Sequence, residues 1–257
     1  MQLPKYEGRI TVPSGGWSVE VDETFGGGGT ETVVFAGAGD YYLGDLVAQL
    51  ATALNASPLT FTYTTSVDDD TSSATGRVTI AATGGTPGPL FTFAWGETEA
   101  RDALGFTGDF ASLGTTQSTN ASPWIWLPDK PRAESLAPNG YDLTVVDGTT
   151  TVAPSGVRYR AQFAKRYYNA FSHVHLLRRK TFTGHESIVN ESLETWWNTV
   201  IAPGYPWRYF ADRSVDATYL NYFAVGEFSE RFAPQRSVNA FMDDFWSIGW
   251  QAARYVG

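Results

Sequence analysis

Hydrophobic positions along the chain repeat with two different periods. Between residues 43 and 55 the apolar side chains recur every three or four positions, which places them on one face of a helix. Most of the remaining chain alternates apolar and polar side chains in short runs, as strands with one buried face do. The chain is therefore predicted to consist mainly of strands. The apolar positions of the helix are Leu43, Leu46, Val47, Leu50 and Leu54.

The second half of the chain shows both periods again. Residues 157–168 include a run that alternates apolar and basic side chains, which predicts a long strand. Asp147-Gly148 separates two shorter strand-like runs, and this dipeptide is a strong signal for a hairpin turn. A second helix is predicted over residues 186–201, where apolar side chains share one face and Pro203 follows.

Each half thus combines several strands with a single helix. Parallel strands need a long, usually helical, crossover between them, and one helix in each half cannot supply enough crossovers. We therefore expect a mainly β fold of two β-sandwich or barrel-like domains, mostly antiparallel, each with one flanking helix.

Charge is distributed unevenly between the two halves. Residues 1–140 contain 16 acidic and 6 basic side chains, whereas residues 141–257 contain 11 acidic and 12 basic ones. The change near Pro138 favours a domain boundary there, with an acidic β-rich domain over residues 1–138 and a second β domain over residues 139–257. The acidic balance of the first domain argues against a phosphate-binding surface on it.

Composition excludes several kinds of chemistry. The 257 residues include no cysteine, which excludes disulfides, Cys-ligated zinc, iron–sulfur clusters and a thiol nucleophile. No apolar stretch approaches the roughly 18 residues that a transmembrane helix needs. We therefore expect no membrane partner and no signal peptide, with synthesis in a cytoplasm.

Few residues form a recognisable catalytic or metal-binding pattern. His173 and His175 share one face of a predicted strand and His185 follows a turn, so a three-histidine zinc site is conceivable, but strand and cap histidines are the favoured interpretation. The acidic triplet 68–70 lacks the spacing of an EF-hand and fits a solvated hairpin tip. No H-E-x-x-H or G-x-S-x-G motif occurs. We predict no catalytic, cofactor or metal site, and no enzymatic activity.

Aromatic and basic side chains are both prominent in the second half. The aromatic residues could stack on sugars or bases, but they occur at helix and strand spacing, which favours packing in a core. The basic residues favour a contact with an acidic neighbouring subunit over specific nucleic-acid binding, because the net charge of the chain is −9. The candidate interface residues are Arg158, Arg160, Arg178, Arg179, Trp207, Arg208 and Arg213.

Two series of motifs cover most of the chain. In the first, over residues 30–107, an extended strand leads into the helix, a hairpin follows, and a Leu-Gly-Phe turn closes the series. In the second, over residues 141–257, a Trp-Trp helix precedes an aromatic strand and a final strand with two tryptophans. The first series contains Gly39-Asp40-Tyr41-Tyr42, Phe61-Thr62-Tyr63, Gly76-Arg77-Val78-Thr79-Ile80 and Ala103-Leu104-Gly105-Phe106, and the second contains Leu193-Glu194-Thr195-Trp196-Trp197, Gly204-Tyr205-Pro206-Trp207-Arg208-Tyr209-Phe210-Ala211-Asp212-Arg213 and Phe245-Trp246-Ser247-Ile248-Gly249-Trp250.

The first series resembles a module found in structural proteins of bacteriophages and other viruses. The second resembles the distal-tail-like or tail-tube-like β fold of minor tail and baseplate proteins in long-tailed phages. The resemblance implies a virion protein of the tail tip or baseplate, which forms a ring, expected to be a hexamer, around the tail axis. It also implies contacts with other tail proteins and needs no cofactor.

Two other functions are compatible with the same sequence. One is a different virion position, such as a neck, tail-completion or capsid-associated protein. The other is a carbohydrate-binding β-sandwich module, for which the aromatic side chains would supply the stacking surface.

Overall fold

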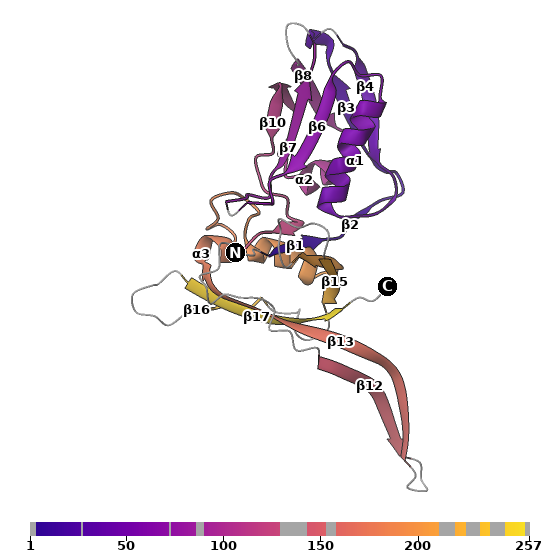
Figure 1. The fold of residues 1–257 in the computed structure, drawn as a ribbon, viewed down its shortest axis with the longest axis vertical. Helices are drawn as coiled ribbons and strands as arrows, with labels where there is room; N and C mark the ends of the chain where they lie inside the picture. The colour runs from indigo at the N-terminus through magenta and orange to yellow at the C-terminus, as the bar shows by residue number, and fades with distance from the viewer. Residues whose placement is uncertain are drawn as a thin grey trace.

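The computed structural model describes residues 4–26, 28–71, 73–85, 90–128, 143–152, 158–210, 219–224, 232–236 and 245–254. Residues 26, 143–152, 158–170, 172, 174, 175, 219–224, 251, 253 and 254 are described by their backbone alone. In this part of the chain the fold is mainly β, with several antiparallel sheets and few short helices (Figure 1). The expectation of a mainly β, antiparallel fold is therefore confirmed. No described helix is long and apolar enough to cross a membrane.

The first unit lies at the top of Figure 1 and is built on a four-stranded and a three-stranded sheet. Alternate side chains of both sheets enter one shared hydrophobic core. A turn at Gly114 carries the chain from one sheet to the other. The four-stranded sheet contains β3 (Trp17–Asp22), β4 (Thr30–Ala36), β8 (Leu90–Trp95) and β9 (Phe110–Leu113), the three-stranded sheet contains β6 (Thr62–Val67), β7 (Val78–Thr83) and β10 (Thr115–Gln117), and β2 (Ile10–Val12) pairs with β5 (Gly39–Tyr41).

Helix α1 (Leu43–Ala56) closes the open side of this unit. It packs against β4 and β6, which are the outer strands of the two sheets. All five apolar residues expected on one helix face are buried, so the predicted helix over residues 43–55 is confirmed. Covering these two sheet edges also protects their unpaired backbone groups.

A short helix, α2 (Thr98–Ala103), leads into the Leu-Gly-Phe turn. Gly105 in this turn has a φ of +80°, and a Cβ there would overlap the backbone oxygen of Asn120. A residue with a side chain would be strained at this position and would also collide, so the turn requires glycine.

The second unit is built on an eight-stranded antiparallel sheet. Two of its strands, β1 and β11, come from the part of the chain assigned to the first domain, so the N-terminal segment contributes to both units. The expected boundary at residue 138 lies outside the described residues. The strand order is β11 (Ile125–Trp126), β1 (Lys5–Gly8), β14 (Trp207–Phe210), β15 (Tyr219–Ala224), β17 (Phe245–Arg254), β13 (Arg158–Leu177) and β12 (Leu143–Val152), with β16 (Gln235–Arg236) beside β17.

The helix predicted over residues 186–201 is shorter than expected. Helix α4 spans Leu193–Trp196 and continues directly into a π-helical turn, η2, over Trp197–Ile201. Ser192 caps the helix, because its hydroxyl accepts a hydrogen bond from the backbone N–H of Thr195 at 3.2 Å. The predicted start at residue 186 is therefore wrong by seven residues.

A loop replaces the missing helical turns for a local reason. Asn190 has a φ of +71°, a left-handed conformation that interrupts a right-handed helix. The next residue, Glu191, binds Lys180 on the short helix α3 (Arg178–Thr181). The side chains of this loop thus make tertiary contacts that a continuous helix would not allow.

The aromatic residues of the second unit form its core, as their spacing predicted. Trp196, Trp197, Trp207 and Trp250 are all buried. Tyr6 of β1 lies at the centre of this cluster. Its ring centroid lies 5.0 to 6.1 Å from those of Trp126, Phe171, His173, Trp196, Trp207, Tyr209 and Trp250.

Strands β12 and β13 extend beyond the body of the second unit as a two-stranded ribbon (Figure 1). Within the described residues, β17 pairs with β13 only from Tyr168 onward. Residues 158–167 of β13 therefore pair with β12 alone. We call β12 and residues 158–167 the hairpin arm.

The expected hairpin at Asp147-Gly148 is not present. Instead, β12 continues through this dipeptide and pairs with β13 on both sides, with a register shift between Asp147 and Gly148. Because β13 is long enough to partner both predicted runs, the Asp-Gly dipeptide stays within β12 and lies opposite a bulge at Phe163 of β13. Residues 153–157, which connect β12 to β13, lie outside the described residues.

Candidate functional site

Strand β1 lies between the two units and is buried on both faces. Tyr6 points into the aromatic core of the second unit, and alternation places Lys5 and Glu7 on the opposite face. Lys5 is paired in register with Phe210 and Glu7 with Arg208 on β14, so these four side chains share the face toward the first unit. This face carries two ion pairs to the first unit, from Lys5 and from Arg208.

Lys5 joins the second unit to the acidic triplet of the first. Its Nζ lies 2.7 Å from Oδ2 of Asp69, and only 5% of the lysine side chain is exposed. The same ammonium lies 4.3 Å from the ring centroid of Phe210, within cation–π range. Within the triplet, Asp68 accepts hydrogen bonds from the N–H and hydroxyl of Thr75. The triplet was expected to be a solvated tip, but Asp68 and Asp69 both have protein partners.

Glu7 caps helix α1 from outside the first unit. Its Oε1 accepts a hydrogen bond from the backbone N–H of Gly44 at 2.8 Å, in the first turn of the helix. Tyr42, at the N-cap position, makes no side-chain cap hydrogen bond, so the carboxylate of Glu7 takes that role. Burial raises the pKa of Glu7, and Lys5 and the Gly44 N–H partly offset that effect.

Arg208 makes the second ionic contact between the units. Its Nη1 lies 3.2 Å from Oδ2 of Asp45, and its guanidinium carbon lies 3.5 Å from the ring centroid of Tyr42. An arginine stacked on an aromatic ring keeps a defined orientation. Burial raises the pKa of the Tyr42 hydroxyl.

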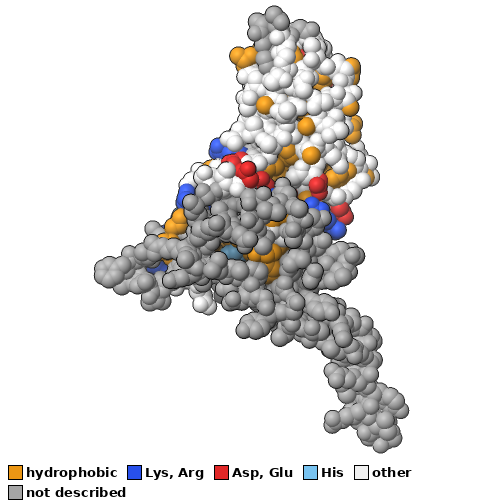
Figure 2. Space-filling model, in the orientation of Figure 1, with side chains coloured by type: hydrophobic (Ala, Val, Ile, Leu, Met, Phe, Trp, Pro, Cys, Tyr) orange, Lys and Arg blue, Asp and Glu red, His pale blue; other side chains and the backbone are white. Residues whose placement is uncertain are grey.

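These residues surround a pocket of about 520 Å³, which we call the junction pocket. On the face drawn in Figure 2, acidic and basic side chains gather at the base of the first unit, near its contact with the second. The apolar part of the pocket wall comes from α1, β6 and β14. Its lining residues are Lys5, Glu7, Gly44, Asp45, Val47, Ala48, Thr65, Ser66, Val67, Asp69, Arg208 and Phe210.

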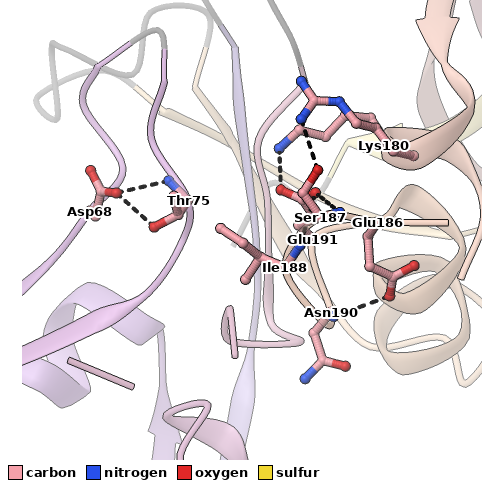
Figure 3. Close-up of polar contacts among 9 residues, drawn as sticks. Asp68, Thr75, Lys180, Glu186, Ser187, Ile188, Asn190 and Glu191 are labelled. Atoms are coloured by element: carbon pink, nitrogen blue, oxygen red, sulfur yellow. Dashed lines mark hydrogen bonds and ion pairs between the residues drawn. The ribbon is translucent and has the colours of Figure 1, made fainter. Parts of the chain in front are cut away.

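A smaller pocket of about 240 Å³ lies where the loop before α4 meets the first unit (Figure 3). Lys180 and Glu191 form a buried ion pair there at 2.9 Å, with side chains 7% and 5% exposed. Glu191 also accepts hydrogen bonds from the N–H groups of Ser187 and Ile188, at 2.7 and 3.3 Å. The carboxylate is thus bound by one cation and two amides, which fixes the shape of the loop.

His173 belongs to the aromatic core and not to a histidine cluster. Its Nε2 lies 2.6 Å from the hydroxyl oxygen of Tyr6, and burial lowers its pKa to about 3. His185 is exposed on the loop that follows α3, and the side chain of His175 is outside the described set. Within the described ranges, no group of three or more His, Asp or Glu side chains is arranged to hold a metal ion.

Glu23 is a fully buried carboxylate whose hydrogen-bond partners lie within the first unit. It accepts hydrogen bonds from the N–H groups of Thr60 and Phe61 and from the hydroxyl of Tyr63. The hydroxyl of Tyr63 therefore has a raised pKa, because burial and the nearby carboxylate both disfavour its ionisation. These contacts hold the start of β6 against the β3–β4 connection.

The seven candidate interface residues lie in different places. Trp207 is in the aromatic core, and Arg208 is at the junction pocket. Arg178 and Arg179 are exposed on α3, where Arg179 donates to the hydroxyl of Ser187 at 3.1 Å. The remaining three are Arg158 and Arg160, at the far end of the hairpin arm, and Arg213, which is outside the described residues.

Sequence reasoning did not find the junction pocket. Its charged residues come from four separate places in the chain, namely β1 (Lys5 and Glu7), α1 (Asp45), the loop after β6 (Asp69) and β14 (Arg208). The one local signal is the alternation of charged and aromatic residues around Tyr6. This run is too short to distinguish a buried strand from a polar N-terminal segment.

No protein-family model matches the chain, and comparison with curated proteins and with solved structures finds no significant match.

Proposed function

We propose that the chain is a structural subunit of a bacteriophage tail tip or baseplate that assembles as a ring around the tail axis. The proposal places it in the virion, after synthesis in the host cytoplasm, with copies of itself and other tail proteins as partners. It rests on the resemblance of both motif series to phage structural proteins. The structural observation that supports assembly is the hairpin arm.

The hairpin arm is long and has little support within its own chain. In the described part of the chain, the ten-residue stretch 158–167 has β12 as its single partner strand, and it corresponds to roughly 33 Å at about 3.3 Å per residue. A two-stranded ribbon alone in water is at best marginally stable. Such an arm gains stability when another surface covers it, and a neighbouring subunit is the surface that an assembling protein provides.

Charge and direction favour a contact between copies of the chain. Residues 143–168 contain four basic side chains, Arg158, Arg160, Lys165 and Arg166, and one acidic side chain, Asp147. The first unit is acidic, but in Figure 1 the arm points away from the first unit of its own chain. A basic arm that meets an acidic unit on the next copy makes a heterologous contact, which closes into a ring when the rotation per subunit allows.

The aromatic core bears on the carbohydrate-binding alternative. The tryptophans considered for sugar stacking include Trp196, Trp197, Trp207 and Trp250, and all four are buried. A buried ring has no free face for a sugar, so these side chains do not support that alternative.

Light scattering of the purified protein, combined with negative-stain images of the same fraction, tests the proposal. We expect a closed ring, of six subunits if the family resemblance extends to stoichiometry. Raising the salt concentration should shift the protein toward smaller species, because exposed ionic contacts are screened. A monomer at every concentration and salt level would contradict the proposal.

A further inference from the structure

The junction pocket contains more carboxylates than cations. Lys5 is bound to Asp69, and Arg208 is bound to Asp45. Glu7 is a third carboxylate in the same lining, and its identified hydrogen-bond donor is the backbone of Gly44. The pocket therefore favours an added positive charge over a negative one.

We propose that the junction pocket receives a guanidinium or ammonium group from the hairpin arm of a second copy of the chain. This inference rests on the proposed function, because it names the place where the arm of one subunit docks on the next.

The shape of the pocket suits an entering basic side chain. Its volume of about 520 Å³ is in the range of ordinary ligand sites. Asp45 stands at the rim with 56% of its side chain exposed, so an incoming cation can reach it from solvent. Thr65 and Ser66 add hydroxyl acceptors to the wall, while Val47 and Phe210 offer apolar surface to the aliphatic part of an arginine or lysine.

The arm of a second copy has the complementary chemistry. Arg158 and Arg160 lie two residues apart on β13, so they share one face near the far end of the arm. In Figure 1 strands β12 and β13 run away from α1 and β6, two of the elements that line the junction pocket of the same chain. The contact therefore joins two copies.

A charge exchange between the arm and the pocket tests this docking site. The arm variant is Arg158→Glu with Arg160→Glu, the pocket variant is Asp45→Lys, and the third protein combines all three changes. Asp45→Lys removes a half-exposed ion pair, which contributes little to folding. Arg236→Glu, at an exposed position on β16, is the matched control for reversing a basic residue that is neither on the arm nor among the candidate interface residues. Thermal unfolding checks that each variant is folded.

The measured quantity is the apparent dissociation constant of the assembly at low salt, by light scattering over a dilution series. We expect the arm variant and the pocket variant each to raise it at least about tenfold, and the combined protein to recover most of that loss. The control should match the wild type.

The outcomes separate this inference from the proposed function. A wild-type chain that assembles, with no response to the arm or pocket variants, overturns the docking site but leaves the ring intact. An arm variant that weakens assembly without recovery in the combined protein shows that the arm binds elsewhere, which also overturns it. A wild-type monomer contradicts the ring itself and the inference with it.

Discussion

The carboxylate of Glu7 accepts a hydrogen bond from the backbone N–H of Gly44 at 2.8 Å. Glu7 belongs to the eight-stranded sheet of the second unit, and Gly44 lies in the first turn of α1 in the first unit. The N-terminus of a helix attracts negative charge, and here that charge comes from the other unit. Folding of α1 and docking of the two units are therefore coupled through one side chain.

Glu7→Ala should lower the free energy of unfolding by about 1–3 kcal/mol, because it removes the cap of α1 and a charge partner of Lys5. Glu7→Gln should cost less, since its amide oxygen can still accept from the Gly44 N–H. Urea unfolding followed by circular dichroism measures both. Glu20→Ala, on an exposed strand position, is the control and should change stability by less than about 0.5 kcal/mol. Equal losses for Ala and Gln would show that the hydrogen bond is not what Glu7 contributes.

The pH dependence of Glu7 has a defined sign. Burial raises its pKa in the folded protein above the ordinary value of 4.5, so the folded state binds this proton more tightly than the unfolded state does. Its contribution is largest below pH 4.5 and is lost as the pH rises through the raised pKa. Glutamine does not titrate, so the stability of the wild type relative to Glu7→Gln should fall as the pH rises. A difference that stays constant with pH, or grows, would contradict this assignment.

The buried pair of Lys180 and Glu191 predicts a large loss when one partner is removed. Lys180→Met leaves the carboxylate of Glu191 buried without its cation and should cost about 3–5 kcal/mol in unfolding free energy. Adding Glu191→Gln should recover part of that loss, since the uncompensated charge is gone. Arg178→Met, an exposed position on the same short helix, should change stability by less than about 0.5 kcal/mol. A double variant as unstable as the sum of the two single variants would rule out the coupling.

His173 should remain neutral through the whole range in which an ordinary histidine gains its proton. Burial lowers its pKa to about 3, whereas the unfolded chain takes up this proton near pH 6.5. The stability that His173 contributes is therefore present above pH 6.5 and declines as the pH falls toward 3. Histidine-selective NMR measures the protonation directly. A His173 resonance that titrates near pH 6.5 would contradict its place beside Tyr6.

Elements with strong local periodicity were predictable from sequence. Helix α1 has five apolar residues at helical spacing, and all of them reach the core. The alternating run over residues 157–168 predicted a long strand, and its described residues lie within β13. The aromatic residues were assigned to the core because their spacing follows the elements that carry them.

Other features depend on partners distant in the sequence. Asp147-Gly148 is a local signal for a turn, but β13 pairs with β12 on both sides of this dipeptide and keeps it within the strand. From its sequence, strand β1 resembles an exposed polar segment. Lys5 and Glu7 are buried because Asp69 and Gly44 of the first unit supply their partners. No pattern in a single segment could reveal the junction pocket.

Shortening the hairpin arm tests the central claim most directly. Replacing residues 149–161 with Asn-Gly would close the ribbon after the pair Gly148 and Gln162, with a two-residue turn suited to a hairpin. The measurement is the molar mass of this variant and of the wild type by light scattering. Thermal unfolding confirms that both proteins are folded. We expect the wild type to form a closed ring and the folded, shortened variant to be monomeric. A shortened variant that forms the same ring, or a wild type that stays monomeric at every concentration, would contradict assembly through the arm.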